Sequence, residues 1–322
     1  MSVGITQFKK ISSITSTSVS DVQSQTLPLD VLGAIYCELS ITHTNAGSSP
    51  SLNTNNMMGV ISDLSIIVNG TRRRVSLPGF ALPLLSYSAT GHAVESNFVT
   101  TTSTQVTSTI GFVIPFANMG SQNNSQASIR PQDSYIDLRP QAGVETASIQ
   151  VQFATPTITN VPSFDSVSLA MTALANTGIS DDITFGIREL RFNTITLDAT
   201  GSKQLNLPVG GNVNQYKAIQ LIGRNSSGVL TDNNTLYDNV ILESLGFEYY
   251  NSASGIIDTI NNYSGVPATT GLQILPLYVY GRLSGRLIAS NVSQLQLELN
   301  SLVTNSSTIT VIQDMINFAP GS

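Results

Sequence analysis

The sequence contains one cysteine, two histidines and no tryptophan among its 322 residues. A lone cysteine, Cys37, excludes an internal disulfide and a cysteine metal cluster, and a buried inert thiol is the expected state. A cysteine nucleophile would need a histidine partner. Cys37 and His43 stand six residues apart, which spans about 20 Å along a strand and excludes a hydrogen bond. The pair of Cys37 with His92 has no supporting motif.

Motifs of enzymes are also missing. The sequence contains no Gly-rich phosphate loop, no nucleophile elbow and no paired-metal spacing. The oxygen-rich segment 232–238 lacks the glycine and the closing glutamate of a calcium-binding helix-loop-helix, so we interpret it as a solvated loop. We therefore expect a protein that is not an enzyme and that has no catalytic residues, no cofactor and no metal.

Charge is scarce. Charged residues make up 11% of the chain, against about 25% in ordinary soluble domains. Ser, Thr, Asn and Gln supply the polar surface instead. A surface of this kind suits a protein that is covered by other protein over much of its area, because interface cores are depleted in Lys, Glu and Asp. A secreted Ser/Thr-rich β-protein has the same composition, so composition leaves both interpretations open.

The net charge is −6 and the pI about 4.8. A protein that packs nucleic acid directly is expected to carry a basic face or arm. None is visible, so we expect no direct nucleic-acid partner. No run of about 20 apolar residues is present that could span a bilayer. The first ten residues lack the apolar core of a signal peptide, so we expect no export by the general secretory route.

Two small basic clusters remain. Lys9-Lys10 near the amino terminus either touches anionic lipid headgroups or is a solvated strand end. Arg72-Arg73-Arg74 follows Asn69-Gly70, a pair that is typical of a hairpin turn. These arginines either pair with acidic groups of a neighbouring subunit, which arginine enrichment at interfaces favours slightly, or keep a loop hydrated.

The chain resembles itself at a spacing of about 180 residues. Leu27-Pro28 returns as Leu207-Pro208, and Ala34-Ile35 returns as Ala218-Ile219. Val60–Asp63 matches Val240–Glu243 and Asn69 matches Asn251 at nearly the same spacing. Phe112–Phe116 with Gln273–Leu277 and Ile149–Phe153 with Leu295–Leu299 follow in the same order along the chain, at smaller spacings. A period of this length is the size of a domain. The sequence therefore predicts two copies of one fold, with the second copy shortened in its loops.

The copies are expected to be β-rich. Ile35, Cys37, Leu39 and Ile41 alternate with polar or aromatic residues, as do Leu295, Leu297 and Leu299, which is typical of half-buried strands. Frequent turn clusters favour antiparallel sandwiches over a parallel α/β sheet. We therefore predict an all-β chain of two tandem antiparallel eight-stranded β-sandwiches.

One short helix is predicted at the same place in each copy. The first lies in residues 79–87, where Pro83 limits its start, and the second in residues 254–263. Ile256, Ile257 and Ile260 recur at helical spacing in the second, Ser254 can begin it and Gly265 can end it. The boundary between the copies is placed in residues 176–182, which gives domains at 1–182 and 183–322.

Tandem sandwiches with a helix at the same point and a shortened second copy resemble the double jelly-roll major capsid proteins of membrane-containing icosahedral viruses. The size and the Trp-free, Ser/Thr/Asn-rich composition are most similar to those of small lipid-containing bacteriophages, including the flavobacterial ones. The resemblance rests on architecture over nearly the whole chain, because the family has no diagnostic short motif.

This resemblance implies a structural subunit of the capsid shell of a virion, made in the host cytoplasm. It implies homotrimers that form pseudo-hexameric blocks and contact neighbouring capsomers, penton and minor capsid proteins, and the lipid of an internal membrane. Lys9 and Lys10 would then be membrane-facing, and Arg72, Arg73 and Arg74 intersubunit residues. The loops 120–131 and 141–146 would be towers or trimer contacts. The alternative is a tandem β-sandwich adhesin or carbohydrate-binding fibre protein, which the absence of tryptophan weakens.

Overall fold

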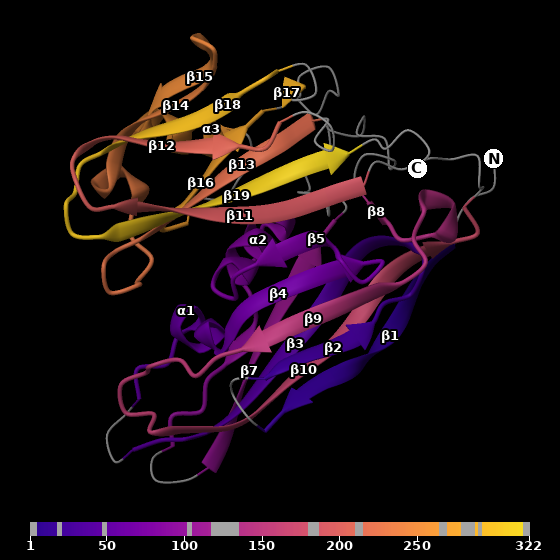
Figure 1. Ribbon diagram of the computed structural model, residues 1–322. Coiled ribbons are helices and arrows are strands. Elements are labelled where there is room, and N and C mark those ends of the chain that lie inside the picture. Colours follow the sequence, from indigo (N-terminus) through magenta and orange to yellow (C-terminus); the bar gives the residue numbers. More distant parts are fainter. Residues whose placement is uncertain are drawn as a thin grey trace. The chain divides into compact units, whose positions relative to one another are not determined.

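The computed structural model describes residues 5–17, 21–46, 50–101, 105–116, 135–179, 187–209, 215–263, 269–277, 287–288 and 292–317. These residues form two compact units, the first built from the described residues up to 179 and the second from those at 187 and beyond (Figure 1). The predicted boundary between 182 and 183 lies outside the described residues and stays a prediction.

The first unit is a sandwich of two antiparallel sheets. One sheet has the order β1-β10-β3-β7, with β6 beside β7 and β8 beside β3. The other has the order β5-β4-β9-β2. The strands are β1 (Ile5–Ser16), β2 (Val22–Thr26), β3 (Val31–Thr44), β4 (Ile61–Val68), β5 (Arg72–Leu77), β6 (Ser96–Asn97), β7 (Gln105–Pro115), β8 (Ile136–Asp137), β9 (Ala147–Phe153) and β10 (Ser163–Thr177).

The second unit is built in the same way. One sheet has the order β11-β19-β13-β16, with β17 beside β13, and the other has the order β12-β18-β14-β15. The strands are β11 (Ile187–Leu197), β12 (Gly201–Leu207), β13 (Gln215–Arg224), β14 (Tyr237–Ser244), β15 (Phe247–Ala253), β16 (Leu272–Pro276), β17 (Leu287–Ile288), β18 (Leu295–Ser301) and β19 (Ser307–Asn317).

The two units share one topology. In each, the first strand pairs with the last, the last with the third, and the third with a strand that comes after the helix, β7 in the first unit and β16 in the second. The second strand pairs with the penultimate one. The penultimate strand also pairs with the first strand of a hairpin, whose second strand ends the sheet. Eight strands in this order, in two sheets, make a jelly roll. The predicted fold class, a double jelly roll of two eight-stranded sandwiches, is therefore confirmed.

Parts of the predicted internal alignment hold at single-residue level. Ala34 lies opposite Pro115 on the neighbouring strand, and Ala218 lies opposite Pro276. Leu207-Pro208 lies at the end of β12 and Leu27-Pro28 directly after β2, and β12 corresponds to β2. These dipeptides thus mark equivalent positions of the two sandwiches.

Other parts of that alignment are wrong. The β4–β5 hairpin turns at Asn69-Gly70 (φ 52° and 73°) and the β14–β15 hairpin at Leu245-Gly246 (φ 50° and 81°), so Leu245 corresponds to Asn69. The predicted counterpart, Asn251, lies inside β15. The connection before the hairpin runs over residues 45–60 in the first unit and 225–236 in the second, and this shortening shifts the register.

Both predicted helices are present. Helix α2 (Ala81–Thr90) follows β5 and ends at Gly91 in a left-handed conformation (φ 74°), while α3 (Ser254–Tyr263) follows β15. Pro83 lies in the first turn of α2, where its missing N–H costs nothing. The predicted apolar face of α3 is partly wrong, because Ile257 is fully buried whereas Ile256 is 54% exposed. Gly265 lies outside the described residues.

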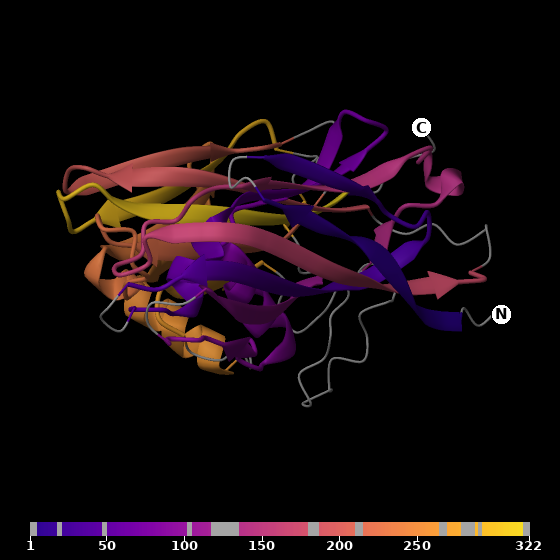
Figure 2. The ribbon, with the colours of Figure 1, turned by 90° about the horizontal axis from the view of Figure 1, so that it is seen from below.

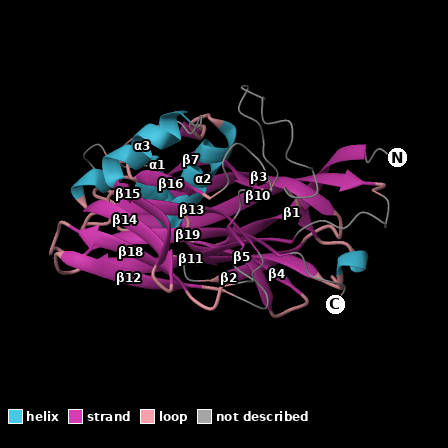
Figure 3. Ribbon diagram, turned by 90° about the horizontal axis from the view of Figure 1, so that it is seen from above, coloured by secondary structure: helices cyan, strands magenta, loops and turns pink. Residues whose placement is uncertain are grey.

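Among the described residues, four further short helical segments were not predicted. They are α1 (Thr54–Met57), capped by Asn53, and the 3-10 turns η1 (Met58–Val60), η3 (Pro140–Ala142) and η4 (Asn233–Thr235). Strands nevertheless dominate both units (Figure 3). The described helices include none with the length and apolarity to cross a membrane.

The core of each unit lies between its sheets. The predicted alternation holds in β18, where Leu295, Leu297 and Leu299 are fully buried. It also holds in β3, where Ile35 and Leu39 are fully buried. Burial of each such side chain contributes about 1.5–3 kcal/mol. The long strands twist, as packed sheets require (Figure 2). The result is a rigid scaffold that displays its edges and loops.

Candidate functional site

The candidate nucleophile is unreactive. Cys37 lies on β3 in the core of the first unit, and burial raises the pKa of its thiol well above the ordinary value. The neutral thiol therefore persists at any physiological pH, and a neutral thiol is neither a nucleophile nor a metal ligand. Within the described ranges, no group of three His, Cys, Asp or Glu side chains could hold a metal ion.

His43 has a structural environment. Its Nε2 lies 2.9 Å from Ser108 Oγ, its ring stacks obliquely on Phe164 at 6.3 Å, and the side chain is fully buried. Burial lowers the pKa of the imidazole, against smaller opposing effects of Asn45 and Asp165. His43 is thus held neutral between two strands, away from solvent.

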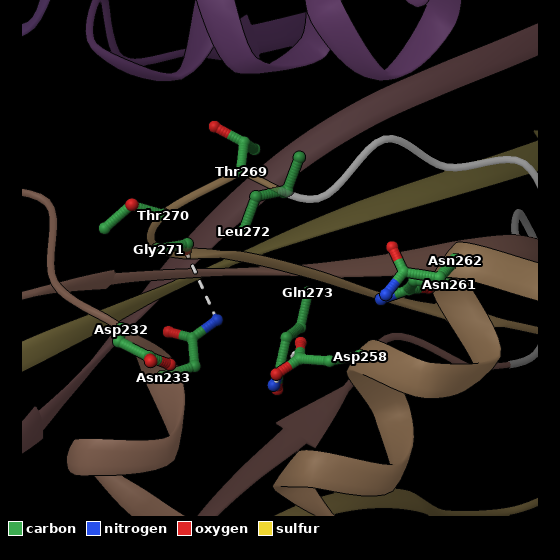
Figure 4. Close-up of a pocket in the computed structure, with 10 residues that line it drawn as sticks. All are labelled: Asp232, Asn233, Asp258, Asn261, Asn262, Thr269, Thr270, Gly271, Leu272 and Gln273. Carbon is green, nitrogen blue, oxygen red and sulfur yellow. Dashed lines mark hydrogen bonds between the residues drawn. The ribbon is translucent and has the colours of Figure 1, made fainter.

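A cavity of about 320 Å³ lies in the second unit, between η4, α3 and the start of β16 (Figure 4). Asn234 Nδ2 donates to both Asp232 Oδ1 (3.1 Å) and Asp258 Oδ2 (2.6 Å), and Gln273 Nε2 donates to Asp258 Oδ1 (2.8 Å). Amide N–H groups of the chain therefore satisfy these two carboxylates. The cavity is lined by Asp232, Asn233, Asp258, Asn261, Asn262, Thr269, Thr270, Gly271, Leu272 and Gln273.

This cavity is part of the framework. Asn233 is buried and donates from Nδ2 to the carbonyls of Leu221 (3.2 Å) and Gly271 (3.3 Å), and Gln273 Oε1 accepts from Tyr237 Oη (2.6 Å). The interpretation of residues 232–238 as a solvated loop is therefore wrong for Asn233 and Tyr237, which tie the loop to the sheet.

Lys9 and Lys10 lie on β1, at the edge of the first unit. Lys9 Nζ forms an ion pair with Asp30 Oδ2 at 2.6 Å. Lys10 is exposed, and none of the ion pairs found among the described residues includes it. Their neighbour Phe8 is 70% exposed, and its ring lies 5.9 Å from that of Tyr36, between centroids, at an interplanar angle of 50°. This edge therefore presents an aromatic ring beside an exposed positive charge.

The three predicted arginines differ from one another. Arg72 and Arg73 are exposed on β5, and Arg73 Nη1 lies 3.8 Å from Asp63 Oδ2. Arg74 is buried, at 3% exposure. The structure therefore leaves Arg72 and Arg73, but not Arg74, at the surface of the hairpin.

The loop 141–146, predicted to be a tower or a trimer contact, is hydrogen-bonded to this hairpin. Asn69 Nδ2 donates to the carbonyl of Gly143 (2.8 Å), and Asn69 Oδ1 accepts from the backbone N–H of Glu145 (2.8 Å). These hydrogen bonds of the Asn69 side chain hold the loop against the hairpin. The other predicted tower, residues 120–131, lies outside the described residues.

Sequence reasoning missed the exposed apolar side chains of the edges. They lie on β1, β2 and the segment after β2 in the first unit, and on the β14–β15 turn, β15 and α3 in the second. A folded chain usually leaves such residues exposed only singly. They are Phe8, Val22 and Leu29 in the first unit, and Leu245, Phe247, Tyr249, Ile256 and Tyr263 in the second. Val229 and Leu302 are also exposed, in the loops before β14 and after β18.

Comparison of the sequence with protein-family models and with curated proteins gives no match. Comparison of the structure with solved structures does. The major capsid protein of Sulfolobus Turreted Icosahedral Virus (STIV) matches with a TM-score of 0.71 and 11% identity, over 98% of this chain and 97% of that chain.

Two further structures extend this likeness. The major capsid protein P2 from bacteriophage PM2 matches with a TM-score of 0.64 and 11% identity, over 99% of this chain and 100% of that chain. The Faustovirus major capsid protein matches with a TM-score of 0.59 and 10% identity, over 100% and 91% of the two chains. At such low identity, the likeness establishes that the fold is shared along the entire chain.

Proposed function

We propose that this chain is the major capsid protein of an icosahedral virus with an internal membrane, and thus a structural subunit with no enzymatic role. The observation that carries the proposal is the repetition of one eight-stranded jelly roll within a single chain. Capsid proteins share this double fold over nearly their full length. The resemblance to flavobacterial phages in particular stays a prediction.

The proposed assembly is a homotrimer that presents six sandwiches as a pseudo-hexameric block. Duplication has a physical advantage here, because six similar bodies tile like a hexamer while the two copies provide different edges. Closed rings require contacts between two different surfaces of each subunit. The two sandwiches do differ in what their edges expose.

The proposed location is the capsid shell of the virion, after synthesis in the host cytoplasm. Its partners would be other copies in the same and neighbouring capsomers, penton and minor capsid proteins, and the lipid of the internal membrane. The net charge of −6 supports separation from the nucleic acid. Because Asp30 neutralises Lys9, a lipid contact by Lys9 and Lys10 has less support than the protein contacts.

Multi-angle light scattering after gel filtration tests the proposal. We expect a particle of three times 34.2 kDa, and negative-stain images with six lobes. A monomer at all concentrations, or a monomer that binds glycans on an array, would instead support the adhesin and contradict the capsid function.

A further inference from the structure

Most of the exposed apolar residues of the two units lie on opposite edges of their common topology. In the first unit, Phe8 and Val22 lie on β1 and β2, the edge strands of the two sheets on one side of the sandwich. In the second, Phe247 and Tyr249 lie on β15, which corresponds to β5 on the other side. Helix α3, with Ile256 and Tyr263, follows β15 directly.

The converse edges carry no such residues. Among the described residues, β5 and α2 of the first unit have no exposed large hydrophobic side chain, and neither do β11 and β12 of the second. The chain therefore has one apolar edge at β1 and β2 of its first sandwich and another at β15 and α3 of its second. Head-to-tail association that closes into a ring needs such a pair of unlike surfaces.

The charges of these edges are complementary. Glu243 and Glu248 lie directly opposite each other across β14 and β15, an arrangement in which like charges repel. Glu248 is exposed, and its Oε2 accepts a hydrogen bond from Asn251 Nδ2 at 2.9 Å. No ion pair found among the described residues includes either carboxylate. A cation from another molecule would remove the repulsion, and Lys10 beside Phe8 is exposed on β1.

The aromatic side chains of the β15 edge also favour contact with a partner. The rings of Phe247 and Tyr249, both exposed, contact each other edge to face at 5.0 Å between centroids. Leu245, 77% exposed at the tip of the hairpin, extends this surface. Leu245 also has a positive φ of 50°, a conformation that is strained for a non-glycine residue. A strained, exposed leucine is readily explained when a partner covers it.

We propose that the β15–α3 edge of one copy docks onto the β1–β2 edge of the next, with Lys10 placed against Glu243 and Glu248 and with Phe8 and Val22 against Phe247 and Tyr249. The proposal rests on the capsid function of the preceding subsection and names the residues of its trimer contact. The partner is a second copy of this chain. Lys10 is thereby assigned to protein and not to lipid.

A charge swap tests this assignment. Lys10→Glu places a third carboxylate against the acidic pair, and Glu248→Lys places two lysines face to face. We expect each single variant to raise the concentration at which the trimer dissociates by at least about tenfold. The double variant, with both changes, is expected to return to within about threefold of the parent. All four proteins are compared by light scattering across a dilution series.

Two matched controls carry the same charge changes elsewhere. Glu95→Lys lies on an exposed segment of the first unit, and Lys203→Glu lies on β12, an edge outside the proposed contact, where it also removes the ion pair with Asp198. Both should dissociate like the parent. Since Lys10 and Glu248 are exposed, the thermal unfolding of the variants at dilutions where they are monomeric should match that of the parent.

The outcomes separate this contact from the capsid function. A trimeric parent whose dissociation is unchanged by both single reversals would overturn the contact and leave the capsid function intact. Single variants that weaken the trimer, without recovery in the double variant, would also overturn the pairing of Lys10 with Glu248. A parent that is monomeric throughout would overturn the capsid function itself.

Discussion

The two sandwiches of this chain have the same strand order and different surfaces. The first turns its β4–β5 hairpin with Asn69, which is bonded to the neighbouring loop, and then presents Arg72 and Arg73. The second turns the equivalent hairpin with Leu245 and then presents Phe247 and Glu248. The two copies thus share a framework and differ in the parts that we propose to meet other molecules.

The buried ion pairs of the two sandwiches also differ. In the second sandwich, Arg188 on β11 and Asp314 on β19 form a buried bidentate pair with distances of 2.8 and 2.6 Å. In the first, the buried pair joins Arg139 to Asp137, two residues away, with distances of 3.0 and 2.8 Å. One pair joins strands that are distant in sequence, whereas the other stiffens a single segment.

Removal of the long-range pair should have the largest effect. Asp314→Ala leaves the buried Arg188 guanidinium without its carboxylate, which is expected to cost about 3–5 kcal/mol of unfolding free energy. Chemical denaturation measures this loss. Asp198→Ala, which removes the exposed partner of Lys203 in the same sandwich, is the control and should leave the denaturation midpoint unchanged. Equal effects of both variants would contradict the role given to burial.

Matched core truncations come next. Leu297 faces Leu242 in the second sandwich, and Ile149 faces Ile66 in the first; all four are fully buried. Leu297→Ala and Ile149→Ala are each expected to cost about 2–5 kcal/mol. If the sandwiches are separate folding units, calorimetry should resolve two transitions, and each variant should shift only one. A single transition shifted equally by both would show that the sandwiches unfold as one unit.

Substitutions in the two hairpin turns should have smaller effects on stability, of opposite sign in the two sandwiches. Leu245→Asn should stabilise the monomer by about 0.5–1 kcal/mol, because asparagine tolerates the left-handed conformation better than leucine does. The reverse change in the first sandwich, Asn69→Leu, should destabilise it, since it also removes the bonds to the loop 143–145. If Leu245 contacts the next copy, Leu245→Asn weakens the trimer while stabilising the monomer. Thermal unfolding and light scattering measure the two effects separately.

The smallest effect should depend on pH and affect one sandwich. Both histidines, His43 and His92, belong to the first unit, and burial lowers the pKa of His43 below 6.5. The unfolded chain therefore binds a proton more readily than the folded one, so this contribution to stability is present above pH 6.5 and is lost as the pH falls below it. His43→Gln should flatten the decline in denaturation midpoint between about pH 7 and 5. An unchanged slope would show that other groups cause it.

The sequence predicts the framework because buried strands leave periodic signals. Alternation in Leu295–Leu299 identifies a strand, and Ala34-Ile35 with Ala218-Ile219 identifies equivalent strands. It misaligns Asn69 with Asn251, because a shortened connection shifts the hairpin and only the turn geometry reveals the shift. In a sequence, Asn-Gly normally indicates a turn with two positive φ angles, whereas Leu245-Gly246 gives no such signal.

The candidate surfaces could not be predicted in the same way. Phe8 and Phe247 read as ordinary strand residues, and only the folded chain shows that 70% and 64% of them remain exposed. Arg72, Arg73 and Arg74 look alike in sequence, yet the third is buried. Surface and interface properties depend on which face of a strand meets the core, and a bulge such as that between Leu242 and Glu243 alters this face locally.

Electron microscopy of the purified protein over a range of concentrations tests the central claim most directly. The account predicts threefold particles with six sandwich-sized lobes, in which β15 of one chain lies beside β1 of the next. Isolated pairs of lobes at every concentration, or rings in which other edges meet, would contradict it.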